Sequence, residues 1–283
     1  VMINPDEERY ILKQAWIPEH IPGLMAGVSG ADFFLCDPFV GLTSNDWLVF
    51  VGYPLRGDFH DEAFEDALRK AMVEFKPARC WFIAPRIPAQ LLGKVLQRES
   101  DDYYRLDLKA LWMRSKVRNM LNRARRDLTV QTGRTLEEPH RTLITDFMGS
   151  QDLDENARHL FERIPDYLAR VSTAEVLSAF DAAGHLIAFD IADFWPDRYV
   201  FYMFTFRSRA HVVPGASDLL LDALLRGTQE RGKSAANLGL GINEGIAFFK
   251  GKWGGEASPN HEFLSFQVRP PSVFESFLRG LMG

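Results

Sequence analysis

The segment Gly215-Ala216-Ser217 has the composition of a phosphate-binding turn. It precedes an apolar stretch with helical periodicity that runs to Arg231, and free backbone N–H groups at the start of a helix attract phosphate. Pro214, just before it, has no N–H to donate. The same residues also suit an ordinary loop-to-helix cap with Ser217 as the N-cap, so both interpretations stay open at this point.

A second segment with chemical potential runs from Asn243 to Lys250. Asn243 is a natural N-cap, and Glu244 falls in the first turn of the predicted short helix, where it is either a cap residue or a general base. Phe249 and Lys250 lie further along this helix. A lysine ammonium can offset phosphate charge or donate to a carbonyl oxygen. The alternative for Lys250 is a solvent-facing position on an amphipathic helix.

Several other residues could carry a proton, and the sequence does not single out one of them. Tyr202 lies on a predicted aromatic strand, where tyrosines also serve as packing residues. His211 is in the glycine loop, Glu175 precedes a strand, and Asp190 alternates with apolar residues, facing either a cleft or solvent. The two cysteines form no C-x-x-C pair and the seven histidines have no metal-ligand spacing, so we predict reduced thiols and no metal site.

The elements that must position these residues follow the same order in both halves of the chain. In the second half, a hairpin with its turn at 181–184 and an aromatic strand at 198–206 precede the glycine loop. A helix at 217–231, a strand at 235–240, a short helix at 243–253 and a last strand at 263–268 follow. The first half repeats the order strand, turn, helix, strand with a strand at 47–53, a helix at 63–75 and a strand at 80–84.

A basic helix is predicted between the halves, at 111–128. Residues 105–134 contain nine Lys and Arg but only two Asp, in a chain whose formal net charge is −5. This face predicts contact with an anionic partner such as tRNA, coenzyme A phosphates or a lipid headgroup. The alternative is a solvated surface that pairs with the acidic segment 146–166. The basic side chains are Arg114, Lys116, Arg118, Arg123, Arg125 and Arg126.

Length and composition bound the class of protein. The 283 residues, 46% hydrophobic and 25% charged, suit about two globular domains with a real core. The net charge argues against a protein that coats nucleic acid over its whole surface. No run approaches 18 apolar residues, and Val1–Arg9 lacks the pattern of a signal peptide, so we expect a cytoplasmic protein without a transmembrane helix.

Three motifs together resemble the Fem-type (FemAB-like) branch of the GNAT N-acyltransferase superfamily. They are Asn237-Leu-Gly-Leu-Gly-Ile-Asn243, Gly245-Ile-Ala-Phe-Phe-Lys250 and Trp253-Gly254-Gly255. The stretch from Ser115 to Arg126 is similar to the connecting helix of those proteins. The C-terminal domain of lysylphosphatidylglycerol synthases has a similar tandem architecture.

This resemblance implies an α/β (α+β) fold of two tandem GNAT-like domains, the first degenerate. The domains would span residues 1–110 and 129–283, joined by the basic helix at 111–128. It implies transfer of an acyl or aminoacyl group from acyl-CoA or aminoacyl-tRNA to a small-molecule or peptide amine. Two alternatives are a lipid-headgroup aminoacyltransferase, whose basic helix meets anionic membrane, and a degenerate binding protein without catalysis.

The resemblance also implies a role for Lys250, which joins the candidates argued above from residue type and position. Lys250 would bind the donor and polarise its carbonyl, with Tyr202 and Glu244 as the other catalytic candidates. The donor would be held by Gly215, Ala216, Ser217, Asn243 and Phe249.

Overall fold

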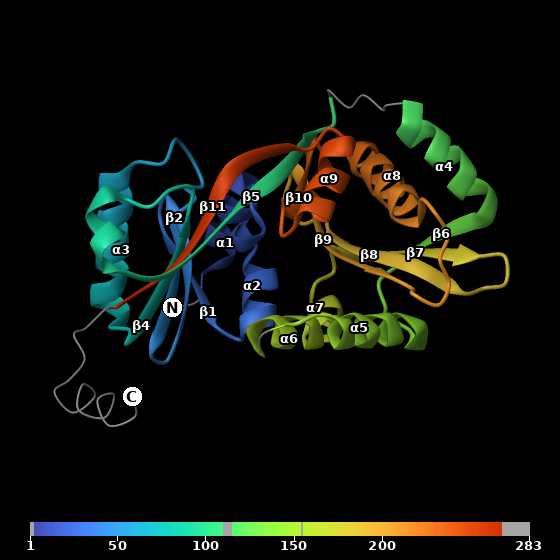
Figure 1. The fold of residues 1–283 in the computed structure, drawn as a ribbon. Coiled ribbons are helices and arrows are strands. Elements are labelled where there is room, and N and C mark those ends of the chain that lie inside the picture. The colour runs from blue at the N-terminus through green and yellow to red at the C-terminus, as the bar shows by residue number, and fades with distance from the viewer. Residues whose placement is uncertain (1–2, 110–114, 154, 268–283) are drawn as a thin grey trace. The chain divides into compact units, whose positions relative to one another are not determined.

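The computed structural model describes residues 3–109, 115–153 and 155–267, which form two compact units (Figure 1). Of the described residues, unit 1 contains 32–100 and 261–267, and unit 2 contains 3–31 and those within 101–260. These units differ in extent from the predicted domains 1–110 and 129–283. The reason is that the N-terminal helices pack into the core of unit 2, where Leu12, Ile21 and Leu24 are buried.

Unit 1 is a sheet with one crossover helix. Its strand order is β1-β2-β3-β4-β11, and only the β3–β4 pair is parallel, with α3 as the crossover. Phenylalanine side chains dominate its core, among them Phe50, Phe64 and Phe82. The elements are β1 (Asp32–Cys36), β2 (Phe39–Ser44), β3 (Trp47–Val51), α3 (Asp61–Phe75), β4 (Arg79–Ala84) and η2 (Ala89–Lys94). The predicted strand, helix and strand of the first half are therefore confirmed.

The two parallel strands of unit 1 stay paired to their ends. The register runs from Trp47↔Arg79 to Val51↔Ile83, and the Gly52 N–H then donates to the Ile83 carbonyl at 2.7 Å. A Cβ on Gly52 would lie 2.9 Å from that carbonyl oxygen. No space opens between these strands, so unit 1 has no slot at the position where a β-α-β unit could admit a ligand.

Unit 2 has the strand order β5-β10-β9-β8-β7-β6. Strands β6 to β9 form an antiparallel meander, and β10 returns parallel to β9 through the crossover helix α8. The strands are β5 (Val95–Asp107), β6 (Leu128–Gly133), β7 (Ala174–Asp181), β8 (Leu186–Asp193), β9 (Tyr199–Arg207), β10 (Ala235–Leu240) and β11 (Glu256–Gln267). Parts of β5 and β11 belong to each unit.

Helices cover both faces of this sheet (Figure 1). One face packs against α4, α8 and α9, and the other against α1, α2, α5 and α7. The helices are α1 (Pro5–Gln14), η1 (Pro18–His20), α2 (Pro22–Ser29), α4 (Ser115–Asp127), α5 (Glu138–Ser150), α6 (Glu155–Glu162), α7 (Ile164–Arg170), α8 (Ala216–Glu230) and α9 (Glu244–Lys252).

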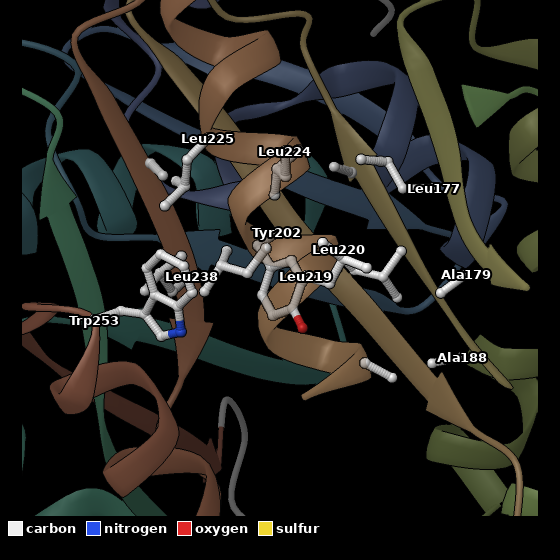
Figure 2. Close-up of a cluster of buried hydrophobic side chains, with 14 of the residues drawn as sticks. Leu177, Ala179, Ala188, Tyr202, Leu219, Leu220, Leu224, Leu225, Leu238 and Trp253 are labelled. Carbon is white, nitrogen blue, oxygen red and sulfur yellow. The ribbon is translucent and has the colours of Figure 1, made fainter. Parts of the chain in front are cut away.

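Strand β9 contributes to the core on both faces. Val200 and Tyr202 belong to the cluster under α8, whereas Tyr199, Phe201 and Phe206 belong to the cluster on the opposite face. Figure 2 shows the first cluster, in which leucines of α8 surround the Tyr202 ring. The packing interpretation of the aromatic strand is therefore confirmed for its four buried aromatic side chains, Tyr199, Phe201, Tyr202 and Phe206.

Two further observations concern membrane-spanning helices and the two cysteines. Within residues 3–109, 115–153 and 155–267, no helix combines the length and the apolar character needed to cross a membrane. Cys36 is half-buried and Cys80 is buried, and both are free thiols. Burial raises the pKa of Cys80 to about 12, so this thiol stays protonated and unreactive near neutral pH.

Candidate active site

Strands β9 and β10 of unit 2 separate partway along their length. They pair only at Ala235↔Tyr199, Ala236↔Val200 and Asn237↔Phe201, although β9 continues to Arg207 and β10 to Leu240. The β5–β10 register also shifts between Asn237 and Leu240. The pairing therefore ends where the equivalent pair in unit 1 stays closed.

Gly239 lies just past the point of separation. Its φ of +74° is in the left-handed region, and its N–H donates to Asn237 Oδ1 at 2.8 Å. A Cβ built on Gly239 would lie 3.5 Å from the Tyr202 carbonyl oxygen and 3.7 Å from Lys250 Nζ. Lys250 of α9 and the backbone of β9 thus converge on one point beside β10.

Lys250 is buried there, with 4% of its surface exposed, which overturns the solvent-facing alternative. Its Nζ donates to the Leu240 carbonyl at 2.5 Å and lies 5.7 Å from the centre of the Tyr104 ring. Burial lowers the pKa of Lys250 to about 8, and the nearby Asp101 carboxylate opposes that shift. An ammonium carries three N–H groups, so Lys250 has donors left for an incoming carbonyl oxygen.

Asp101 holds the loop that leads into α9. Its carboxylate accepts hydrogen bonds from the N–H groups of Gly241 at 3.1 Å and Ile242 at 2.8 Å. Ile242 is β-branched and has a φ of +58°, a costly conformation that these bonds help to fix. The Asn243 side chain accepts from the Ile246 N–H at 3.0 Å, which confirms it as the N-cap. The loop and cap together set the direction in which α9 presents Lys250.

The hydroxyl of Tyr202 points into the core under α8. It donates to Asp190 Oδ1 at 3.4 Å, and Asp190 is fully buried. Asp190 therefore faces neither a cleft nor solvent, contrary to both expectations. Burial raises the pKa of Asp190 to about 7 and also raises the pKa of Tyr202. Within the described chain, Asp190 Oδ2 has no hydrogen-bond partner.

The start of α8 differs from the sequence prediction. Gly215, with a φ of +86°, is the N-cap, no side chain caps the helix in the described structure, and Ser217 lies inside the first turn. The prediction of Ser217 as N-cap is wrong because the left-handed glycine lets the helix begin earlier. A Cβ on Gly215 would lie 2.9 Å from Met120 Cγ of α4, so close packing also requires glycine here.

A buried carboxylate joins the two candidate segments. Asp218, in the first turn of α8, accepts from Lys252 Nζ at 2.9 Å and from Trp253 Nε1 at 2.9 Å. These contacts bring the C-terminal end of α9 against the first turn of α8. The structure thereby places the Gly215–Ser217 turn and the helix of Lys250 in one region, with Phe249 half-buried against the same core. Glu244 is exposed at the opposite end of α9.

The basic helix α4 packs its apolar face on α8 and exposes its charges. Arg125 pairs with Asp222 of α8 at 2.7 Å, so its ion partner is not in the predicted acidic segment 146–166. Arg114 lies outside the described residues. The exposed basic side chains on the described part of α4, besides Arg125, are Lys116, Arg118, Arg123 and Arg126.

A cavity of about 180 Å³ lies on the other face of unit 2, next to the end of the β9–β10 pairing. Its lining residues are Trp16, Arg105, Tyr199, Asn237, Ser258 and Pro259. Sequence reasoning missed this cavity, and among its residues only Asn237 was part of a motif. A larger hollow of about 400 Å³ lies over the exposed side of α3 and holds none of the predicted residues. Across the described ranges, no three His, Cys, Asp or Glu side chains gather as a metal site.

No protein-family model and no curated protein matches the sequence, but solved structures match the fold. The crystal structure of FemX aligns over 100% of this chain and 99% of its own, with a TM-score of 0.65 and 12% identity. L-PGS from Bacillus licheniformis aligns over 99% and 97%, with a TM-score of 0.60 and 16% identity. A tandem GNAT protein from the clavulanic acid biosynthesis pathway aligns over 96% and 98%, with a TM-score of 0.54 and 11% identity.

At these identities the likeness shows the fold. The predicted fold class, two tandem GNAT-like domains in an α/β chain, is confirmed. The first domain is degenerate in the sense that its parallel pair, β3–β4, stays closed. The resemblance to the Fem-like and lysylphosphatidylglycerol synthase structures is confirmed as a likeness of fold.

Proposed function

We propose that this chain is an acyltransferase that moves an acyl or aminoacyl group from an activated donor to an amine. The observation that carries the proposal is the buried Lys250 ammonium, 3.7 Å from the position of a Gly239 Cβ, where β9 and β10 separate. The fold shared with FemX and L-PGS supports it. Acyl-CoA and aminoacyl-tRNA are the two donor classes.

In the proposed reaction, the donor carbonyl enters beside Gly239 and its oxygen accepts a hydrogen bond from Lys250. The acceptor nitrogen attacks the carbonyl carbon, and Lys250 stabilises the negative oxygen that develops. This attack forms the C–N bond, and collapse of the intermediate restores the C=O bond and breaks the C–S or C–O bond to the donor. The amine loses one proton, and the leaving thiolate or alkoxide gains one.

The remaining predicted residues take supporting roles in this proposal. The N–H of Ser217 in the first turn of α8, which Gly215 begins, would hold a donor phosphate. The Ala216 N–H, which donates to the Val213 carbonyl at 3.3 Å, would have to leave that bond to join it. Phe249 lies on the α9 side, and Asn243 caps the other end of α9. The Asp218 carboxylate lies in the same first turn of α8, and its negative charge is balanced by Lys252, whose Nζ lies 2.7 Å from Asp218 Oδ1. Glu244 and Tyr202 are the proposed proton carriers. A proton taken by Tyr202 would pass towards Asp190, its hydrogen-bond partner.

A lipid-headgroup acceptor is the second candidate function. The exposed basic face of α4 favours it, because cationic helices bind anionic membrane surfaces. The similarity in fold to L-PGS is consistent with a lipid-headgroup acceptor. The same face would also suit tRNA as the donor carrier.

The test measures transfer from a panel of acyl-CoA and aminoacyl-tRNA donors to mixed amines. We expect Lys250→Met to lower turnover at least tenfold, which corresponds to about 1.4 kcal/mol of transition-state stabilisation. Lys233→Met is a matched control. Lys233 also donates to a backbone carbonyl, that of Pro196 at 2.5 Å, and burial also lowers its pKa.

Lys233 precedes the opposite end of β10, so its substitution should leave turnover within about threefold of wild type. Circular dichroism of both variants checks folding. Equal losses in the two variants, or no loss in Lys250→Met, would contradict the site assignment. A panel without any transfer by the wild-type chain would contradict the function.

A further inference from the structure

The cavity beside the β9–β10 separation has a chemical character of its own. Its walls combine two aromatic rings, a proline, a serine, an amide and one guanidinium, and none of the described carboxylates lines it. Asn237, only 4% exposed, donates from Nδ2 to the Trp16 carbonyl at 3.1 Å and accepts the Gly239 N–H. Asn237 therefore connects the cavity wall with Gly239, the glycine that lies beside Lys250.

Of the described residues that line this cavity, only Arg105 is a cation. Its guanidinium lies over the Tyr199 ring, 5.4 Å from the ring centre. Stacking of this kind orients the flat group and leaves its N–H edge available. Among the residues that the structure describes, no carboxylate forms an ion pair with Arg105. Its charge is therefore available to an anionic ligand.

We propose that this cavity is the acceptor subsite, and that Arg105 binds the carboxylate of a small amine acceptor. This inference rests on the proposed function. One guanidinium matches the single charge of a carboxylate and its two-oxygen edge. A phosphate monoester carries more charge than one at neutral pH, and the described lining offers it no second cation.

The position of the cavity suits an approach opposite to that of the donor. Phe249 of α9 and Trp253, which follows this helix, pack in the cluster under α8, whereas Tyr199 and the half-buried Trp16 belong to the other face of the sheet. The donor carbonyl would then be met by Lys250 from one face and by the acceptor nitrogen from the other. Such an arrangement keeps the two substrates from competing for the same space.

The strand geometry also sets the length of the acceptor. Arg105 is paired with Asn237 across β5 and β10, and Gly239 is two residues further along β10. Two residues of a strand span roughly 6–7 Å. An amine that reaches the carbonyl while its carboxylate stays at Arg105 therefore needs several bonds between the two groups. An α-amino acid that must use its α-amine is too short.

The experiment uses ω-amino carboxylates of increasing length: glycine, 4-aminobutyrate and 6-aminohexanoate. Butylamine serves as the probe without an anion, and 3-aminopropylphosphonate as the probe with a phosphonate. Binding to the full chain is measured without donor, by ligand-observed NMR, so that the result does not depend on transfer. Transfer assays then give KM and kcat for the same probes.

The variant is Arg105→Gln, and the matched control is Arg79→Gln. Arg79 also lies over an aromatic ring, that of Trp81 at 5.8 Å, but it is in unit 1 and pairs with Asp46 at 3.2 Å. We expect the longer amino carboxylates to bind wild type and Arg79→Gln alike. They should bind Arg105→Gln at least tenfold more weakly, with KM raised and kcat little changed. Glycine and butylamine should bind weakly to all three proteins.

Three results would overturn the subsite: butylamine binding as well as 4-aminobutyrate, the phosphonate binding more tightly than the carboxylates, or unchanged binding in Arg105→Gln. The failure of the proposed function has a different signature. If carboxylates bind in an Arg105-dependent way but no donor supports transfer, carboxylate binding by Arg105 stands, but the function and the acceptor role fail. If transfer occurs and the KM for the amino carboxylates is the same in wild type and Arg105→Gln, the function stands and the subsite fails.

Discussion

Lys250 has an ionisation that should be visible in the pH dependence of transfer. Its pKa is lowered to about 8, so the ammonium is lost at a pH where exposed lysines keep their charge. Because the proposed role needs the cation, we expect kcat/KM to fall as pH rises through about 8. Lys250→Arg, whose guanidinium stays charged, should keep its lower activity flat through that range.

The measurement is a pH–rate profile of both proteins between about pH 6 and 10. A rate that rises through pH 8 would mean that the free amine acts as a base, and would contradict the role given to the ammonium. The same pKa also affects stability. Between about pH 8 and 10.5 the unfolded chain holds a proton that folded Lys250 has released, so this residue makes the free energy of unfolding rise with pH. Comparison with Lys250→Met isolates that contribution, which is on the order of 3 kcal/mol.

At the scale of single residues, sequence patterns predicted the N-cap of α9 but neither the N-cap of α8 nor the orientation of Asp190. Asn243 is the N-cap because its type and position suffice for that role. The orientation of Asp190 could not be predicted because every residue of β8 is buried, so the strand shows no polar face. The register shift between Ile191 and Ala192 further obscures the alternation.

The link between α8 and α9 depends on one carboxylate. Asp218 is buried and binds both Lys252 and Trp253. We expect Asp218→Ala to lower the free energy of unfolding by about 1–3 kcal/mol, because the buried Trp253 indole and the partly buried Lys252 ammonium lose their acceptor. Asp218→Asn should lose less, since its carbonyl oxygen can still accept from the indole. Urea unfolding of both variants provides the measurement.

Asp66 supplies the control for that comparison. It forms an exposed i,i+3 pair with Arg69 at 3.1 Å on α3, and exposed pairs contribute little. Asp66→Ala should therefore change the free energy of unfolding by less than about 0.5 kcal/mol. If Asp218→Ala is as mild as Asp66→Ala, the carboxylate does not hold the two helices together.

Elements whose apolar residues recur at a regular spacing could be predicted from the sequence. Strand β5, which depends on pairing with its neighbours, could not. The strand–helix–strand order of β3, α3 and β4 follows from runs of apolar residues with matching spacing. Strand β5 was missed because most of Val95–Asp107 is polar and exposed, so only its partners make it a strand. The end of the β9–β10 pairing is likewise a property of two strands, and neither sequence shows it alone.

At the scale of the whole molecule, charge is distributed unevenly. The net charge is −5, yet the exposed face of α4 is cationic. We expect the triple substitution of Lys116, Arg123 and Arg126 by Glu to reduce binding to tRNA or anionic vesicles at least tenfold. Wild-type binding should weaken steeply as salt is added, because phosphate contacts release counterions.

The control carries the same charge change elsewhere, with Lys13, Arg69 and Lys70 replaced by Glu. Sedimentation with anionic and neutral vesicles, and a mobility shift with tRNA, separate the two partners. Equal binding by both triple variants would show that α4 is not the contact surface. The sequence indicated the charge of this helix, whereas its packing against α8 required the fold.

The division into compact units was the least predictable feature. Residues 3–31 pack in unit 2 although most of unit 1 follows them in the chain. This assignment depends on contacts such as Asn237 with the Trp16 carbonyl, which join residues more than 200 positions apart. Local propensity carries no information at that separation.

The contrast between the two parallel strand pairs has a consequence for stoichiometry. The chain contains two versions of one β-α-β unit, but β3 and β4 remain closed while β9 and β10 part. Titration with a donor should therefore saturate at a single equivalent per polypeptide. If a mutation disables the β9–β10 pair, the closed β3–β4 pair cannot take its place. Duplication of this motif therefore provides no redundancy.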